Sequence, residues 1–294
     1  MPTQQELTAE IALVHSLKFL VQAYEELAIM KMQQIRNKVL NTRTYVEGLT
    51  EVFFDVHRSY RRQVEQLMKE NKGKQGFSFS TLAKNGKGIS VLISPNQRLS
   101  GTIAFSVFSA FLNHIKQSKD EVVIVGKVGK DMWEQRNLGK NFTYFEAPDE
   151  QAQAKDLEPI ISKLMQYETV NVFHGKYQNL IRQDATISNV TGDDSLLKPK
   201  EDSEKRRMFL FEPMLKDVLH FFEVQITATL FQQTIHESHL AHLGSRITAM
   251  EEASGNIDNR LLTLKHDKLK IIKAINNKKQ IQTYAGMSLW QCAR

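Results

Sequence analysis

The sequence predicts an α/β protein: long N- and C-terminal helices form an antiparallel coiled coil, and a small Rossmann-like α/β domain lies between them in the chain. Three observations carry this prediction. Near the C-terminus, apolar residues recur with the three-then-four spacing of a heptad. At the N-terminus, no proline occurs between Pro2 and Pro95, and no glycine precedes Gly48. Ten of the 14 glycines lie between residues 73 and 192, so the chain turns mainly in its middle.

The first long helix is predicted over residues 1–72. Thr3 and Glu6 have the spacing of a capping box, which marks a helix start. We expect its contact seam to contain Leu13, Leu17 and Leu20. About 65 residues at 1.5 Å rise span roughly 100 Å. A helix of that length is not buried end to end in a domain of this size, so it pairs with the other long helix or with a partner.

The second long helix is predicted over residues 212–294, starting at Glu212-Pro213, because proline is well tolerated in a first helical turn. We expect its seam to contain six apolar residues: Leu240, Leu243, Ile247, Met250, Leu261 and Leu264. The alternative is a helical bundle with short loops inside these stretches. The heptad spacing favours the coiled coil.

The central domain is predicted over residues 73–211. Short apolar or β-branched runs predict strands at 89–94, 122–126, 142–145, 170–175 and 208–211. Helical stretches separate them at 102–116, 131–137 and 151–167. This alternation predicts a small, mostly parallel sheet with helices on its faces. Residues 184–207 are polar and highly charged, and we expect a mobile segment there.

Composition restricts the classes of function. The 294 residues carry a net charge of +6, which suits an acidic protein surface, a phosphate backbone or an anionic membrane. A single cysteine, Cys292, excludes an internal disulfide and fits a reducing compartment. No apolar run reaches 18 residues, and we therefore expect neither a transmembrane helix nor a secretory signal. Any action at a membrane is then expected through a partner.

Two motifs suggest catalytic chemistry and fail on their details. The run Gly126-Lys127-Val128-Gly129-Lys130 follows a predicted strand, but only two residues separate its glycines, and Asp131 replaces the Ser or Thr of a phosphate loop. The run from His236 to His239 lacks the second histidine of a zinc-protease motif. We interpret His236, His239 and His242 as part of a solvated polar face rather than as metal ligands. The sequence predicts no catalytic site, no metal and no cofactor.

Basic residues lie along both long helices. The first carries Lys31, Arg36, Lys38 and Arg43, and the second carries Lys265, Lys268, Lys270 and Lys273. If the helices run antiparallel, these residues form one positive collar, which favours an acidic partner. The structural alternative is charge that is simply solvated.

Short motifs follow one another between residues 209 and 256: Phe209-Leu210-Phe211-Glu212-Pro213, His236-Glu237-Ser238, Ser245-Arg246, Ala249-Met250, Ala253 and Asn256. They resemble the C-terminal signature of the gamma subunit of F-type ATP synthases, and from residue 237 to residue 256 the spacing fits without a gap. Further segments agree in order: Gln22-Ala23 with Leu27-Ala28 and Lys31, then Ile93-Ser94 with Leu99-Ser100-Gly101. The resemblance covers almost the whole chain.

The chain departs from this family at several positions. Ala241 and His242 replace a usual Ser-Glu pair, Pro95 replaces an Asp, and Ser100 replaces a Cys. Residues 269–273 lack the Gln of the family's contacts to a beta subunit, although Lys270 can replace the Arg. The resemblance therefore describes a divergent member, from a synthase or from another F-type-like motor.

The resemblance implies a central-stalk rotor that couples rotation of a membrane c-ring to conformational change in a hexamer of alpha and beta subunits, with epsilon as a further partner. It implies no catalytic residue in this chain and a peripheral position on the cytoplasmic face of a bacterial inner membrane or the matrix side of an organelle. The candidate contacts to the stator are Gln22, Lys31, Arg246, Met250, Lys268 and Lys270.

Two other functional classes stay open on the sequence alone. A coiled-coil scaffold or adaptor would use the α/β domain to bind a partner, and a constitutive dimer would favour it. A nucleic-acid binder would use the basic residues, but acidic residues are mixed with them and no recognition motif occurs, so we expect no nucleic acid.

Overall fold

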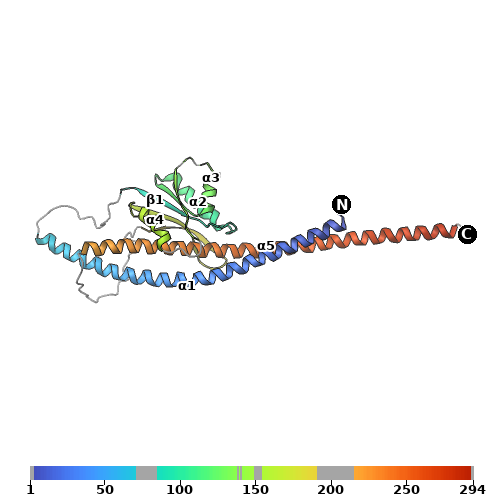
Figure 1. Ribbon diagram of the computed structural model, residues 1–294, viewed down its shortest axis with the longest axis horizontal. Helices are drawn as coiled ribbons and strands as arrows, with labels where there is room; N and C mark the ends of the chain where they lie inside the picture. Colours follow the sequence, from blue (N-terminus) through green and yellow to red (C-terminus); the bar gives the residue numbers. More distant parts are fainter. Residues whose placement is uncertain are drawn as a thin grey trace. The chain divides into compact units, whose positions relative to one another are not determined.

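The computed structural model describes residues 3–70, 85–137, 139, 141–148, 154–190 and 215–292 (Figure 1). The chain divides into two compact units. The coiled-coil unit consists of Met1–Ile29 and Ile247–Arg294, and the α/β unit consists of Met30–Arg246. The two long helices, α1 (Gln4–Glu70, 67 residues) and α5 (Leu215–Cys292, 78 residues), each contribute to both units.

The start of α1 is the capping box that the sequence predicts. The backbone N–H of Thr3 donates to Oε2 of Glu6 at 2.8 Å, and the N–H of Glu6 donates to Oγ1 of Thr3 at 3.2 Å. Two N–H groups at the helix start are thereby satisfied. The predicted start of the second helix at Pro213 lies outside the described residues.

In the coiled-coil unit, α1 and α5 run antiparallel (Figure 1), and they share one apolar seam. Leu7 and Val14 of α1 are buried against Leu261 and Leu264 of α5, and Ile11, Ile257 and Ile271 pack around them. Two ion pairs border this seam. Nζ of Lys18 lies 2.6 Å from Asp258, and a guanidinium nitrogen of Arg260 lies 2.7 Å from Glu10.

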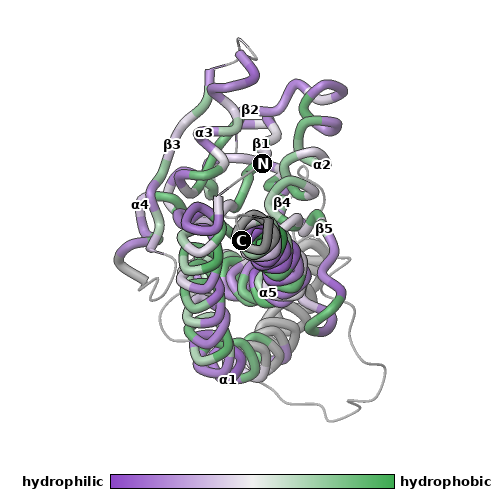
Figure 2. Tube along the Cα trace, turned by 90° about the vertical axis from the view of Figure 1, so that its right-hand side faces the viewer, coloured by the Kyte–Doolittle hydropathy of each residue, from purple (hydrophilic) through white to green (hydrophobic). Residues whose placement is uncertain are grey.

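The structure corrects the predicted seam of the first helix. Leu13, Leu17 and Leu20 are 67%, 46% and 55% exposed, while Val14 is buried. The buried and half-buried positions run through 7, 11, 14, 18, 21, 25 and 28, a second heptad one residue out of phase with the leucines. Because one residue turns a helix by about 100°, this shift moves the leucines off the seam. Both long helices carry apolar and polar residues along their length (Figure 2).

A five-stranded sheet forms the centre of the α/β unit, with the order β3-β2-β1-β4-β5. Its strands are β1 (Gly88–Ile93), β2 (Glu121–Val125), β3 (Phe142–Phe145), β4 (Thr169–Tyr177) and β5 (Gln183–Asn189). Strand β1 pairs in parallel with β2 and β4, and β2 pairs in parallel with β3, whereas β5 is antiparallel to β4. The sequence predicts the first four strands. The strand predicted at 208–211 lies outside the described residues.

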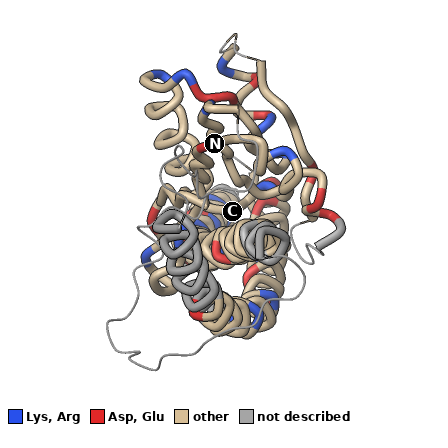
Figure 3. The backbone as a smooth tube through the Cα atoms, turned by 90° about the vertical axis from the view of Figure 1, so that its left-hand side faces the viewer, with Lys and Arg blue, Asp and Glu red and all other residues tan. Residues whose placement is uncertain are grey.

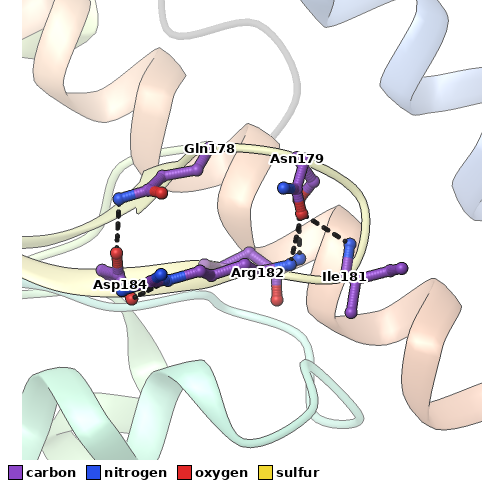
Figure 4. Close-up of polar contacts among 6 residues, drawn as sticks. Gln178, Asn179, Ile181, Arg182 and Asp184 are labelled. Carbon is purple, nitrogen blue, oxygen red and sulfur yellow. Dashed lines mark hydrogen bonds and ion pairs between the residues drawn. The ribbon is translucent and has the colours of Figure 1, made fainter.

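Strand β5 occupies part of the segment that the sequence predicts to be mobile. Residues 184–189 pair with β4, whereas residues 191–207 lie outside the described part of the chain. Asn179 shapes the turn into β5, because its Oδ1 accepts the N–H groups of Ile181 at 3.1 Å and Arg182 at 2.7 Å (Figure 4). The strand is half-exposed and polar because it lies at the sheet edge, so it lacks the apolar pattern of the inner strands.

The helices cover both faces of the sheet (Figure 1). On one face, α2 (Ile103–Gln117) and α3 (Lys127–Gln135) contribute Phe108, Phe111 and Trp133 to a core with Leu92 and Phe173. On the other face, α4 (Ala154–Leu164) and part of α5 pack on the strands. This second core is formed by Ile89, Val91, Val172, Leu157, Ile160, Phe231 and Ile235, among others. Since alternate residues of β1 enter different cores, the strand is buried on both faces.

Candidate functional site

The stretch of α5 from residue 234 to residue 245 is buried on nearly every side. Only His239 in this stretch is half-exposed. His236, Glu237 and Ser238 are at most 9% exposed, and His242 is 5% exposed. The prediction of a solvated polar face is therefore wrong for His236 and His242. Its physical reason is that this part of α5 is an inner helix of the α/β unit, and polarity alone does not place a helix at the surface.

The buried histidines of this region are kept neutral. Burial, followed by the charge of Lys38 on α1, lowers the pKa of His236. Burial also lowers the pKa of His174 on β4, whose Nε2 lies 2.8 Å from Oγ of Ser188 and whose Nδ1 lies 3.1 Å from the carbonyl oxygen of Gly175. A neutral imidazole is compatible with an interior that an unpaired positive charge would destabilise.

Small residues bring α5 close to the sheet. A Cβ on Gly175 of β4 would lie 3.0 Å from Cβ of Ala241, so these two backbones meet with almost no side chain between them. One turn later, a Cβ on Gly244 would lie 3.1 Å from Nε2 of Gln183 and 3.3 Å from the ring of Tyr177. Glycine and alanine are needed here because a larger side chain would separate the helix from β4 and β5.

The loop between β1 and α2 is fixed to α5 by Ser245 and Arg246. Gly101 has φ +65°, and a Cβ there would lie 2.1 Å from Oγ of Ser245. The guanidinium of Arg246 donates from Nε to the carbonyl oxygen of Leu99 at 2.9 Å and from Nη2 to that of Arg98 at 3.3 Å. Its Nη1 lies 3.4 Å from Oε1 of Gln97. Hence three of the nitrogens of Arg246 hold this loop within the same chain.

The other predicted stator contacts lie in different environments. Gln22 is exposed, Met250 is buried, and Lys270 is exposed with Nζ 3.6 Å from Oδ1 of Asp267. Lys31 and Arg246 line one pocket of the α/β unit, whereas Lys268 and Lys270 belong to the coiled-coil unit. The sequences of both long helices mix Lys and Arg with Asp and Glu, and both charge signs are visible on the tube in Figure 3. The collar stays a prediction.

The predicted seam residues of α5 are all buried. Leu240 and Leu243 lie in the α/β unit, and Ile247, Met250, Leu261 and Leu264 lie in the coiled-coil unit. Only the last two belong to the cluster with Leu7 and Val14. The same apolar repeat of α5 therefore serves two different units.

The turn after β2 does not offer a phosphate loop. The N–H groups of Lys127, Val128 and Gly129 at the start of α3 donate to Oδ1 of Asn96, the carbonyl oxygen of Pro95 and Oγ of Ser94, at 2.9–3.1 Å. A phosphate ion bound at this turn would need these N–H donors.

Among the described residues, no group of three His, Cys, Asp or Glu side chains could hold a metal ion.

One polar constellation was not singled out in the sequence. Oδ2 of Asp120 accepts the hydroxyl of Ser90 at 2.7 Å and lies 3.2 Å from Nε2 of His114. The carboxylate lies between the serine and the histidine, whereas a catalytic triad needs the histidine between the other two. The group therefore fixes the start of β2 against β1 and α2.

No helix within the described residues is long and apolar enough to cross a membrane.

Comparisons with known proteins agree on one family. The sequence profile of the family described as ATP synthase matches residues 3–270. The ATP synthase gamma chain of Protochlamydia amoebophila is 22% identical over 97% of this chain and 98% of its own length. That of Mycoplasmopsis pulmonis is 24% identical over 90% of this chain and 91% of its own length.

Two solved structures share the fold. A chain of the Euglena gracilis mitochondrial ATP synthase, from an OSCP/F1/c-ring structure in rotational state 3, has a TM-score of 0.54 at 15% identity and covers 89% of this chain and 95% of that chain. A chain of the Tetrahymena thermophila mitochondrial ATP synthase central stalk and c-ring has a TM-score of 0.52 at 16% identity, with coverages of 80% and 99%.

Proposed function

Because this chain belongs to the ATP synthase family, among its gamma chains, we propose that it is the central-stalk rotor of an F-type ATP synthase or ATPase. In this role it couples rotation of a c-ring in the membrane to conformational change at the catalytic sites of an alpha/beta hexamer. One observation carries the mechanical part of the proposal: a single helix, α5, pairs with α1 in the coiled-coil unit and is buried in the core of the α/β unit.

Torque requires a continuous connection between the two ends of a rotor. Helix α5 runs without a break from Leu215 to Cys292, so a turning force on the α/β unit acts on a helix that also forms the coiled coil. Phe231 and Ile235 anchor this helix in the core, and Arg246 fixes it to the loop after β1. The anchoring is more extensive than one surface contact, because it combines apolar burial, close backbone approach and three polar contacts.

The proposed partners follow from the family. Alpha and beta subunits would surround the coiled coil, and the epsilon subunit and the c-ring would contact the α/β unit. The exposed apolar side chains of α1 support a partner for the coiled coil, because Leu13, Leu17, Leu20, Tyr24 and Leu27 lie at heptad spacing and are 46–67% exposed.

The chain itself is proposed to be a non-catalytic subunit that contributes to the activity of the complex. The occupied N–H groups after β2 support this, because they leave the turn no donors for a nucleotide phosphate. Its proposed place is the cytoplasmic face of a bacterial inner membrane, or the matrix side in an organelle, with membrane contact only through partners.

Reconstitution tests the rotor directly. The full chain is expressed together with alpha, beta and epsilon subunits from its own source, and the purified complex is analysed by native mass spectrometry. A rotor is present as one copy beside three alpha and three beta subunits, since one asymmetric helix pair fills a three-fold ring. A bead attached to the α/β unit should then rotate in one direction when ATP is added. Recovery of a hexamer without this chain, or of a homodimer of this chain, would refute the rotor.

A further inference from the structure

A small pocket lies at the carboxyl ends of β1 and β2, beside the buried part of α5. Its volume is ≈ 40 Å³, and its walls include Ser94 after β1, Lys31 of α1, and Ser238, His242 and Arg246 of α5. All of these residues belong to the α/β unit. In open α/β sheets, ligands bind outside the carboxyl ends of the strands, and this pocket lies at that edge of the sheet.

Two polar side chains of this pocket have no hydrogen-bond partner. Within the described part of the chain, both ring nitrogens of His242 and the hydroxyl of Ser238 lack a hydrogen-bond partner. Both residues are almost completely buried, and their spacing of four places them on one face of α5. Buried polar groups are nearly always hydrogen-bonded, and an unpaired one is destabilising. A bound species that pairs with Ser238 and with the nitrogen of His242 facing it would reduce this destabilisation.

The charge of the walls favours an anion. Lys31, His239 and Arg246 line the pocket, and none of the described residues that line it is acidic. Burial, followed by the charges of His239 and Arg246, lowers the pKa of His242 to about 3. His242 is therefore neutral near pH 7 and offers one N–H donor and one acceptor nitrogen. Arg246 supplies positive charge even while it donates to the loop after β1.

We propose that this pocket binds one inorganic phosphate ion, which accepts hydrogen bonds from Ser238 and His242 and is neutralised by Lys31 and Arg246. The volume holds about three water molecules, which suits a small tetrahedral ion rather than a nucleotide. Near neutral pH, phosphate keeps at least one hydroxyl group, so it can pair with the ring nitrogen of His242 that faces it in either tautomer. Sulfate has the same shape but only accepts, so it pairs with that nitrogen only when the nitrogen carries the proton.

Titration of the purified full chain with inorganic phosphate, in a chloride buffer at pH 7, tests the site. Isothermal titration calorimetry and ³¹P NMR line broadening should both report saturable binding of one ion. Sulfate should bind about tenfold more weakly, because it cannot donate a hydrogen bond. The test uses the isolated chain, so its result does not depend on assembly of a rotor.

Two variants locate the ion. His242→Leu and Ser238→Ala should each weaken phosphate binding by about tenfold or more, because each removes one buried hydrogen bond to the ion. The matched control is His266→Leu, which replaces an exposed histidine of α5 in the other unit and should leave binding unchanged. Circular dichroism checks the fold of each variant. If His242→Leu does not fold, Ser238→Ala and the comparison with sulfate decide.

Three outcomes would overturn the proposal: no saturable phosphate binding by the wild-type chain, equal binding of phosphate and sulfate, or unchanged binding in folded Ser238→Ala. In the first case, ordered water alone pairs with His242 and Ser238.

Discussion

Nε of Arg246 on α5 donates to the carbonyl oxygen of Leu99 at 2.9 Å, across 147 residues of sequence. Leu99 has φ +65°, a left-handed conformation that is uncommon for a residue with a side chain. The loop after β1 therefore keeps an unfavourable backbone geometry, and Arg246 stabilises it by contacts to residues 97, 98 and 99. Through this loop α5 is bound to the end of β1.

Replacement of Arg246 by lysine should lower the free energy of unfolding by about 1–3 kcal/mol, because one ammonium cannot reach all three acceptors that the planar guanidinium reaches. Urea unfolding followed by circular dichroism measures this change. The matched control is Arg98→Lys, since the Arg98 side chain is exposed and pairs only at the surface with Asp131, at 3.0 Å. That control should change stability by less than about 1 kcal/mol. Equal effects of the two substitutions would contradict the assigned role of Arg246.

Gly101→Ala should destabilise the chain by about 3 kcal/mol or more, because the new Cβ combines a left-handed backbone with severe overlap. It would lie 2.1 Å from Oγ of Ser245 and also 2.5 Å from the backbone oxygen of that residue. The double variant Gly101→Ala, Ser245→Ala should therefore fail to restore stability. Gly139→Ala is the control: Gly139 also has φ +65° but has nothing within 4 Å, so it should lose only about 1 kcal/mol. Thermal unfolding of the four proteins makes the comparison, and full rescue by Ser245→Ala would exclude the backbone overlap.

Adjacent residues of α1 test the corrected seam. Val14→Asp places a charge in the buried seam and should cost several kcal/mol, whereas Leu13→Asp introduces it at an exposed position and should change stability by about 0.5 kcal/mol or less. Met250→Asp, at a buried position of α5, should resemble Val14→Asp. Chemical denaturation of the full chain measures all three. If Leu13→Asp lowers the free energy of unfolding more than Val14→Asp does, the seam contains Leu13 rather than Val14.

Stability should fall as the pH falls below about 6.5, in part because of His242. Its pKa in the folded chain is lowered to about 3, so between these values the unfolded chain binds a proton that the folded chain does not. The slope for one such group is at most about 1.4 kcal/mol per pH unit. His242→Leu should therefore flatten the pH dependence between pH 5 and 6.5, a range above the ordinary titration of carboxylates. His266→Leu, at an exposed position, should keep the wild-type slope. Parallel curves for wild type and His242→Leu would show that His242 is accessible to protons.

The proposed collar is tested in the assembled complex. The triple variant Lys31→Glu, Lys268→Glu, Lys270→Glu reverses the charges that are predicted to face acidic loops of the beta subunits. It should reduce the torque of ATP-driven bead rotation and leave the isolated chain folded, because Lys270 is exposed and Lys31 and Lys268 are partly exposed, and charges in contact with solvent contribute little to stability. The matched control reverses Lys278 and Lys279, which are exposed residues of α5 outside the proposed set. Unchanged torque in the triple variant would remove the collar from the mechanism.

The local features of this fold were readable in the sequence. The capping box needs only Thr3 and Glu6. The inner strands β1, β2 and β4 can be recognised as apolar runs, because both of their faces are buried. The heptad spacing of α5 likewise predicts a long pairing helix, since it depends on the period of one helix alone. These signals arise within one element and its neighbours in sequence.

Tertiary structure decided the features that depend on which surfaces meet. Two apolar stripes of α1 share the same spacing, and only packing against α5 selects Val14 over Leu13. Strand β5 is polar because it lies at an edge, so its pairing with β4 identifies it rather than its composition. Folding of the chain brings Arg246 to Leu99, and it brings Ser238 to Ser94 in the wall of the pocket; each pair is more than 100 residues apart in the sequence. Their roles follow from distance in space, which the period and composition of a single segment do not encode.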